Sequence, residues 1–169
     1  RLTVGTTLTR RDVMLLSLMS SENRAAYALG RTYPGGMGAF IQAMNAKAAM
    51  LNMYSAQFVD PSGLSSANQA SAMDLAKMVN AATQYKAIRE LSTNDSAYIY
   101  TADGNYKKYV NSNRLITRNM GWDIGLQKTG TLSAAGKCLV LQTRINGTPK
   151  IMVFLDSRSA DSRVADAVK

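Results

Sequence analysis

The hydrophobic pattern of the chain changes its period near residue 95, and this change constrains the fold more than any other feature. Before it, apolar residues recur at helical spacing, most clearly over 37–53. After it, five segments have the pattern of β-strands: 98–101, 107–113, 124–130, 136–146 and 149–156. Asn146-Gly147, between the last two, is a strong hairpin signal. We therefore expect an α+β fold in which helices pack on an antiparallel meander.

The length of 169 residues favours one domain, because it allows one core and is short for two. We expect a helical part at about 9–92, a sheet part at about 95–156 and a terminal helix at about 160–169. Three hydroxyl residues have the sequence context of helix N-caps: Thr9, Ser71 and Ser159.

The first helix should be buried, because its sequence VMLLSLM at 13–19 is apolar on nearly every face. The polar run Ser20-Ser21-Glu22-Asn23 interrupts it, and a second helix follows over 24–31. Tyr33-Pro34-Gly35-Gly36 then breaks the helical pattern.

The absence of histidine from the whole sequence removes several kinds of catalysis at once. Ser-His-Asp and Cys-His arrangements and most zinc sites are excluded, so a hydrolase of this sequence needs a lysine or a carboxylate as its base. The single cysteine, Cys138, forms no internal disulfide and no cysteine metal cluster. Its apolar strand context predicts a buried, inert thiol. We expect no metal ion and no cofactor.

The net charge of +9 raises the question of an anionic partner. The basic residues of the chain are scattered, and only the pairs Arg10-Arg11 and Lys107-Lys108 are adjacent. The sequence has no aromatic-basic motif of a nucleic-acid-binding module. We therefore expect solvated surface charge rather than a nucleic-acid groove. An anionic cell-envelope polymer fits the charge equally well.

No transmembrane segment is expected, because the longest apolar run, at 13–19, is far too short to span a bilayer. Nothing at the N-terminus has the zones of a signal peptide. Any export signal is therefore expected to be removed or to lie outside this chain.

Two short motifs carry the chemistry of the sequence. Lys128-Thr129-Gly130 lies on an expected strand before a β-hairpin, and Ser21-x-Asn23 lies at the end of the buried helix. By chance a Lys-Thr-Gly triplet occurs in roughly a few per cent of such chains, whereas Ser-x-Asn occurs in roughly half. Their order, spacing and predicted elements give the pair its weight.

The similarity to a known family extends beyond these motifs. The stretches TLTRRDVMLLSLMSSENRAAYALG, FVDPSGLSSANQASAMDLAKM and WDIGLQKTGTLSAAGKCLVLQTRING resemble the S11 peptidases, the low-molecular-mass penicillin-binding proteins. These are D-alanyl-D-alanine carboxypeptidases and endopeptidases, and the resemblance to the endopeptidases is the greater. It spans essentially the whole chain. It implies a penicillin-binding protein/β-lactamase-like transpeptidase fold in the bacterial periplasm, peptidoglycan stem peptides as substrates, and inhibition by β-lactams.

Three catalytic roles transfer from the family by residue. Ser21 would relay a proton between the base and the leaving amine, and Asn23 would hydrogen-bond the peptide group of the substrate. Lys128 would supply positive charge near the terminal carboxylate of the substrate and the relay hydroxyl.

Four neighbouring residues would bind the substrate: Lys128, Thr129, Gly130 and Thr131. Thr129 would donate a hydroxyl hydrogen bond, and Gly130 would let the strand edge approach the substrate closely. The backbone N–H of Thr131 would be one of two oxyanion donors, a contact whose loss typically slows such enzymes about a hundred- to a thousandfold.

Each motif also has an ordinary structural interpretation. Ser21 and Asn23 are also compatible with simple helix capping, and Lys128 and Thr129 with solvent-facing strand positions. Other conspicuous residues are expected to have structural roles: a turn at Asp60-Pro61-Ser62-Gly63, and packing by Tyr98 and Trp122.

The nucleophile of the family is missing from the sequence. It lies in a Ser-x-x-Lys motif, where one helical turn places the lysine amine beside the serine. No lysine of this chain has a serine three residues before it, and the nearest approach, Thr83-x-x-Lys86, lies in the wrong order. We expect the chain to be the C-terminal portion of one catalytic domain, inactive alone. Either a companion segment completes it, or the fragment rearranges or self-associates.

The alternative is a non-catalytic cell-wall or partner-binding module that keeps the substrate groove. The residues do not separate endopeptidase from carboxypeptidase activity, and only the resemblance favours the former.

Overall fold

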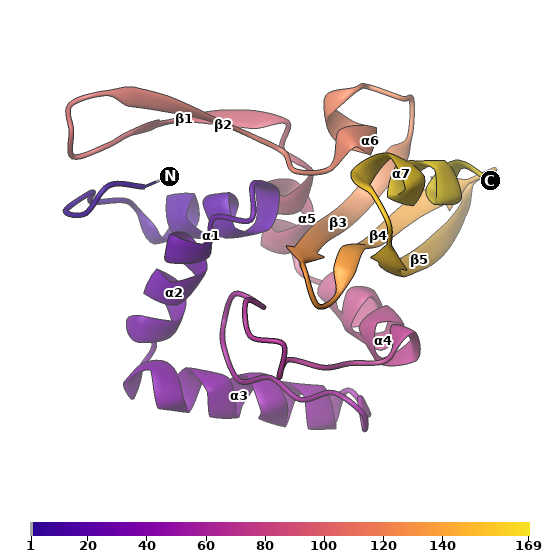
Figure 1. Cartoon of the computed structure of the whole chain (residues 1–169), viewed down its shortest axis with the longest axis horizontal. Helices are drawn as coiled ribbons and strands as arrows, with labels where there is room; N and C mark the ends of the chain where they lie inside the picture. Colours follow the sequence, from indigo (N-terminus) through magenta and orange to yellow (C-terminus); the bar gives the residue numbers. More distant parts are fainter. Residues whose placement is uncertain (1) are drawn as a thin grey trace.

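The computed structural model describes residues 2–169, so Arg1 lies outside the described part. The helices are α1 (Arg10–Met19), α2 (Asn23–Arg31), α3 (Gly36–Met50), α4 (Ala72–Ala82), α5 (Lys86–Thr93), α6 (Arg114–Thr117) and α7 (Ala160–Val168). The strands are β1 (Ser96–Tyr100), β2 (Tyr106–Val110), β3 (Asp123–Leu132), β4 (Gly136–Ile145) and β5 (Thr148–Ser157). The predicted α+β class is confirmed (Figure 1).

The strands do not form the single meander that the sequence suggested. Strands β1 and β2 pair as a separate antiparallel ribbon, while β3, β4 and β5 form an antiparallel sheet in that order. The segment 111–121, which carries α6, separates the two sheets along the chain. β3 is an edge strand of its sheet, and it lies toward the centre of the molecule (Figure 1).

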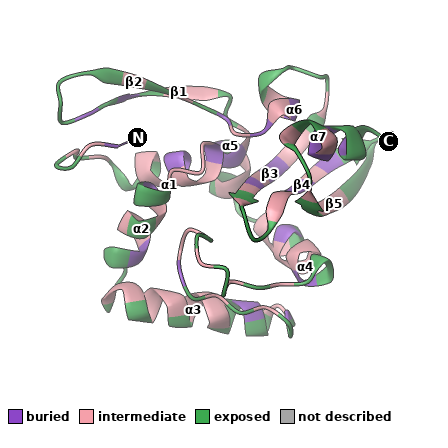
Figure 2. Ribbon diagram, viewed as in Figure 1, coloured by how far each residue is buried: buried purple, intermediate pink, exposed green. Residues whose placement is uncertain are grey.

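Helices cover both faces of the three-stranded sheet. Successive side chains of β4 point to opposite faces, so neighbouring residues of this strand contact different helices. Leu139 and Leu141 are fully buried and pack against α7 and α6 through Val164 and Leu115. Val140, between them, packs on the other face against Val79 of α4. Burial follows this pattern along the sheet (Figure 2).

Helix α1 is buried as predicted, with Leu16 and Met19 fully enclosed. It packs between Leu91 of α5 and Ile99 of the ribbon, and none of residues 12–20 is exposed. Because both sides of this helix are fixed, the turn that follows it is held in a defined place.

The three predicted N-caps are confirmed, with side-chain oxygens accepting backbone N–H bonds three residues later. Thr9 accepts from Asp12 at 3.1 Å, and Ser71 accepts from Asp74 at 3.1 Å. Ser159 accepts from Ser162 at 2.9 Å in a full capping box. These contacts fix the starts of α1, α4 and α7.

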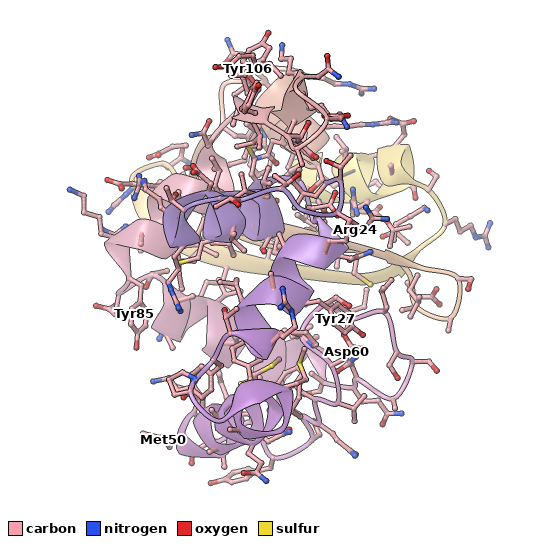
Figure 3. All side chains as sticks on the ribbon, turned by 90° about the vertical axis from the view of Figure 1, so that its left-hand side faces the viewer. Arg24, Tyr27, Met50, Asp60, Tyr85 and Tyr106 are labelled. Atoms are coloured by element: carbon pink, nitrogen blue, oxygen red, sulfur yellow. The ribbon has the colours of Figure 1, made fainter. Side chains whose placement is uncertain are left out.

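The ribbon projects from the rest of the molecule, and Tyr106 lies at the extreme opposite to Met50 of α3 (Figures 1 and 3). The packing role expected of Tyr98 is wrong, because this side chain is 65% exposed, with the Lys108 amine 5.8 Å from its ring centroid. It lies on the face of the ribbon that points away from α1. Trp122, in contrast, packs against the core between the sheet and α7, as predicted.

Among residues 2–169, no helix has the length and apolar character needed to cross a membrane.

Candidate active site

A groove of about 970 Å³ lies between three parts of the chain. One side is the turn after α1 together with Ser112, and the second is the loop 58–70. The third is the β3–β4 end of the sheet with the start of α7. All the predicted site residues line this groove: Ser21, Asn23, Lys128, Thr129, Gly130 and Thr131.

Ser21 occupies the turn between α1 and α2 with a positive φ of 55°. This left-handed conformation is uncommon for a residue with a side chain, and glycine or asparagine usually adopts it at a helix end. The turn is fixed by the N–H of Glu22, which donates to the carbonyl of Leu16 at 3.1 Å. The backbone thus projects the Ser21 hydroxyl into the groove.

The structure does not favour the capping interpretation of the Ser-x-Asn motif. Glu22 is the side-chain N-cap of α2 and accepts from the N–H of Arg24 at 3.2 Å. Asn23 is the first residue of that helix, exposed at the groove. Neither motif residue is therefore needed to cap a helix through its side chain.

Lys128 joins the two motifs. Its ammonium group donates hydrogen bonds to the hydroxyl of Ser21 and, at 2.6 Å, to the carbonyl of Thr129. Burial and, to a smaller extent, the positive charge of Arg163 together lower the pKa of Lys128 from 10.5 to about 8. The amine can therefore exist in both protonation states near neutral pH.

The remaining motif residues lie along the same stretch of β3. The side chain of Thr129 is buried, whereas Thr131 is exposed. Gly130 is paired with Cys138 of β4, and a Cβ at Gly130 would lie 3.4 Å from the Cβ of Cys138. Because β3 has no further strand partner among the described residues, its outer edge can pair with an extended ligand.

Arg163 of α7 is a site residue that the sequence analysis missed. Its side chain is buried, and its guanidinium donates to the carbonyls of Gly130 at 3.2 Å and Cys138 at 2.7 Å. Burial also lowers the pKa of this guanidinium. No sequence motif marks Arg163, because only the packing of α7 on the sheet brings it to the groove.

Ser112 was missed as well. Its sequence pattern predicts a strand over 107–113, but β2 ends at Val110. Its hydroxyl lies 2.6 Å from the hydroxyl of Thr129 and 3.5 Å from that of Ser21. A polar Asn-Ser-Asn run directly after a strand was the one available signal.

The loop 58–70 owes its shape to Asp60, which the sequence placed in a turn without chemistry. The buried carboxylate accepts from the N–H groups of Ser62, Gly63 and Ser65 and from the Asn68 amide, at 2.6 to 2.8 Å. Burial alone would raise the pKa of Asp60, but these hydrogen bonds outweigh it and hold the pKa well below its ordinary value. The turn is confirmed, and it also builds one side of the groove.

The prediction for Cys138 needs correction. The thiol is only partly buried, and it lines the groove beside Gly130. Its Sγ lies 3.2 Å from the carbonyl oxygen of Ala135. Cys138 is the third residue of β4, close to the β3–β4 turn at which the strand begins.

Among residues 2–169, no cluster of three or more histidine, cysteine, aspartate or glutamate side chains is arranged to hold a metal ion. The charged groups of the groove are instead dominated by cations, with Lys128, Arg163, Arg114 and Lys137 against Asp156. Such a groove suits a ligand that carries a carboxylate.

Comparison with known proteins shows to which family the chain belongs. The sequence model of the D-alanyl-D-alanine carboxypeptidase family, peptidase S11, matches residues 1–159, and the chain belongs to this family. It is 44% identical over 170 residues to a D-alanyl-D-alanine endopeptidase of Pseudomonas aeruginosa, a match that covers 100% of this chain and 54% of the relative. A D-alanyl-D-alanine endopeptidase of Escherichia coli is also 44% identical, over 168 residues, with 99% of this chain and 54% of the relative covered.

The fold is similar to that of a solved DD-transpeptidase. The Streptomyces K15 DD-transpeptidase superimposes with a TM-score of 0.88 at 27% sequence identity, covering 99% of this chain and 68% of that structure. The predicted transpeptidase fold is thereby confirmed. The chain spans about half the length of the curated relatives that it matches.

Proposed function

We propose that this chain forms the substrate-binding side and the proton-relay groups of a peptidoglycan D,D-peptidase. The reaction would proceed through an acyl-serine intermediate, and penicillins would inhibit it by acylating the same serine. That serine would belong to a Ser-x-x-Lys segment, which this sequence does not contain. The proposal explains why two family motifs meet in a groove although the sequence has no Ser-x-x-Lys motif.

The contact between Lys128 and Ser21 carries this proposal. The two residues are 107 positions apart, and they come from an edge strand and a helix-ending turn. A structural serine in a turn does not require a partly buried lysine as its partner, because burying an amine is costly unless it is well hydrogen-bonded. The pairing is understandable if the hydroxyl is to exchange a proton in a positively charged site.

In the proposed acylation step, the absent serine attacks the carbonyl carbon of the scissile peptide bond and gives its proton to the lysine of its own motif. Ser21 would accept that proton while passing its own hydroxyl proton to the leaving nitrogen, so the number of protons is conserved. Lys128, with a pKa of about 8, is about nine-tenths charged at pH 7. Its charge would stabilise oxygen-centred negative charge on Ser21 during this transfer.

The substrate backbone would lie along the open edge of β3, as peptides often do at exposed strands. Thr129 would donate to its carboxylate, the N–H of Thr131 would face the developing oxyanion, and Asn23 would bind its peptide group. The similarity to two endopeptidases favours cleavage within cross-linked stem peptides rather than at a free terminus. A periplasmic location follows from this substrate.

Labelling with a fluorescent penicillin tests the proposal. The 169-residue chain alone should remain unlabelled on a denaturing gel, whereas a preceding segment that carries Ser-x-x-Lys should be labelled when this chain is added. Labelling of the present chain would show that a nucleophile has been overlooked. Intact mass spectrometry of the native protein identifies any companion segment directly.

A binding module without catalysis is the second candidate, and the missing Ser-x-x-Lys motif favours it. In that case the added segment would stay unlabelled although the chain remains folded and binds stem peptides. The two candidates therefore give opposite labelling results in the same experiment.

A further inference from the structure

Ser112 lies where the two motifs meet, in the short connection between β2 and α6. Its hydroxyl is 2.6 Å from that of Thr129, 3.5 Å from that of Ser21 and 3.2 Å from the carbonyl oxygen of Met19. Its own N–H also donates to that carbonyl at 2.9 Å. One side chain thus contacts the end of α1, the Ser-x-Asn turn and the Lys-Thr-Gly strand.

The backbone around Ser112 is fixed on both sides by buried asparagines. The Asn111 amide donates to the carbonyls of Ser92 at 2.9 Å and Asn94 at 2.7 Å. Asn113 is 1% exposed and caps α6 with its side chain. A serine held so firmly at a groove can keep its hydroxyl at one position.

Counting protons gives these hydroxyls a direction. Each serine or threonine hydroxyl donates one hydrogen bond and accepts others. The Lys128 ammonium donates to Ser21, so Ser21 must donate its own proton elsewhere, and Ser112 is the hydroxyl within reach among the described residues. The Met19 carbonyl, 3.2 Å from the Ser112 hydroxyl, can only accept the Ser112 proton. If Ser112 instead donates across its shorter 2.6 Å contact, the proton of Thr129 is left free to point into the groove.

We propose that Ser112 is a positioning residue that links Ser21 and Thr129 into one chain of hydroxyls. Through this chain, a charged Lys128 directs the Thr129 proton outward, toward a ligand carboxylate. A neutral Lys128 instead accepts the Ser21 proton, which lets the chain reverse and turns the Thr129 proton inward. The role in turnover rests on the proposed peptidase function, whereas the hydroxyl chain is a property of this polypeptide alone.

Two variants of matched shape test the chain of hydroxyls. Ser112→Thr keeps the hydroxyl, and Ser112→Val has a methyl group in place of that hydroxyl. The threonine and valine side chains have nearly the same volume. Without the Ser112 acceptor, the Ser21 proton turns to the Lys128 amine and favours its neutral form. Titration of ¹³C-labelled lysine by NMR in the 169-residue chain should therefore show the Lys128 pKa lower in the Val variant than in the Thr variant, by roughly half to one unit.

Both variants leave Arg163 in place, which is the charged group whose field acts on Lys128. Circular dichroism and denaturant unfolding show whether the two variants fold equally well. Equal Lys128 titration in the two variants, or a higher pKa in the Val variant, overturns the proposal and leaves Ser112 a brace between segments.

A second measurement addresses turnover. With a Ser-x-x-Lys segment added, the second-order rate constant of penicillin acylation should fall at least about tenfold in the Val variant and remain within about threefold of the parent in the Thr variant. Ser133→Val, at an exposed serine in the β3–β4 turn, should leave it unchanged. An equal fall of the acylation rate constant in both Ser112 variants contradicts the positioning role. Absence of acylation in the parent itself would refute the peptidase function, while the titration still decides the fate of the hydroxyl chain.

Discussion

Arg163 and Gly130 are joined by a hydrogen bond of 3.2 Å, in which the guanidinium of an arginine that is 4% exposed donates to the backbone carbonyl of the Lys-Thr-Gly strand. The same guanidinium donates at 2.7 Å to the carbonyl of Cys138 on the neighbouring strand. One side chain of the terminal helix thereby fixes two strands at the groove. The stability of the sheet and the chemistry of the site are consequently coupled at Arg163.

Replacement of Arg163 by methionine should lower the free energy of unfolding by about 2–4 kcal/mol, because the buried carbonyls of Gly130 and Cys138 lose their donor. It should also raise the pKa of Lys128, since a neighbouring positive charge is removed. Denaturant unfolding and lysine NMR titration measure the two effects. Arg158→Met, at an exposed arginine, should change stability by no more than about 0.5 kcal/mol. Equal free energies of unfolding for the two variants would contradict the structural role of Arg163.

The depressed pKa of Lys128 predicts a specific dependence of stability on pH. Between about pH 8 and the ordinary value of 10.5, the unfolded chain binds more protons at this residue than the folded chain. The free energy of unfolding of the parent should therefore rise with pH relative to Lys128→Met, by at most about 1.4 kcal/mol per pH unit. If the free energy of unfolding changes equally with pH in the two proteins across this window, burial does not lower the pKa of Lys128.

Asp60→Asn should destabilise the loop 58–70 by about 2–4 kcal/mol, because an amide group would face the donors of Ser65 and Asn68. Its folded-state pKa lies below the unfolded value, so the stabilisation by Asp60 is present above about pH 4 and is lost as the pH falls through the folded pKa. Thermal unfolding from pH 3 to 7 should therefore show the parent and the variant converging in acid. Asp166→Asn, at an exposed carboxylate, is the control and should change the stability at pH 7 by no more than about 0.5 kcal/mol.

Gly130→Ala separates binding from folding. Gly130 does not have a positive φ, and the added Cβ would make a 3.4 Å contact with the Cβ of Cys138, so stability should change by no more than about 1 kcal/mol. Penicillin acylation in the presence of a Ser-x-x-Lys segment should nevertheless fall at least about tenfold, because the methyl group crowds the strand edge. Gly38→Ala on α3, where a Cβ meets no other atom within 4 Å, is the matched control and should acylate normally. If Gly130→Ala is acylated as fast as the parent, the ligand does not approach the edge of β3 closely at this residue.

Much of the fold follows from local signals. The caps at Thr9, Ser71 and Ser159 and the hairpin at Asn146-Gly147 depend on nearby residues, so the sequence predicts them correctly. Helices α5 and α6 were not predicted, since eight and four residues are too few to establish a helical period.

The division of the strands into two sheets was also beyond the sequence. Alternation along the ribbon reveals two faces but not which of them meets a helix. As a result, Tyr98 was assigned to packing although Ile99 is the residue that enters the core.

The candidate site likewise contains residues that the sequence predicts and residues that it does not. Ser21, Asn23 and the Lys-Thr-Gly triplet were recognisable because their spacing is a family motif. Ser112 and Arg163 act through tertiary contacts, 91 residues from Ser21 and 33 residues from Gly130, and no local pattern specifies such partners. The contacts of Ser112 depend on the end of α1 lying beside β3, whereas those of Arg163 depend on the packing of α7 on the face formed by β4 and β5.

The position of Cys138 has a practical consequence. Because it is the one thiol of the sequence and it lines the groove, an environment-sensitive dye can be attached there without first removing competing cysteines. Its fluorescence would report a ligand entering beside Gly130 in real time, even when no covalent bond forms. The chain thus carries a natural attachment point for an optical sensor of the ligands proposed for this groove.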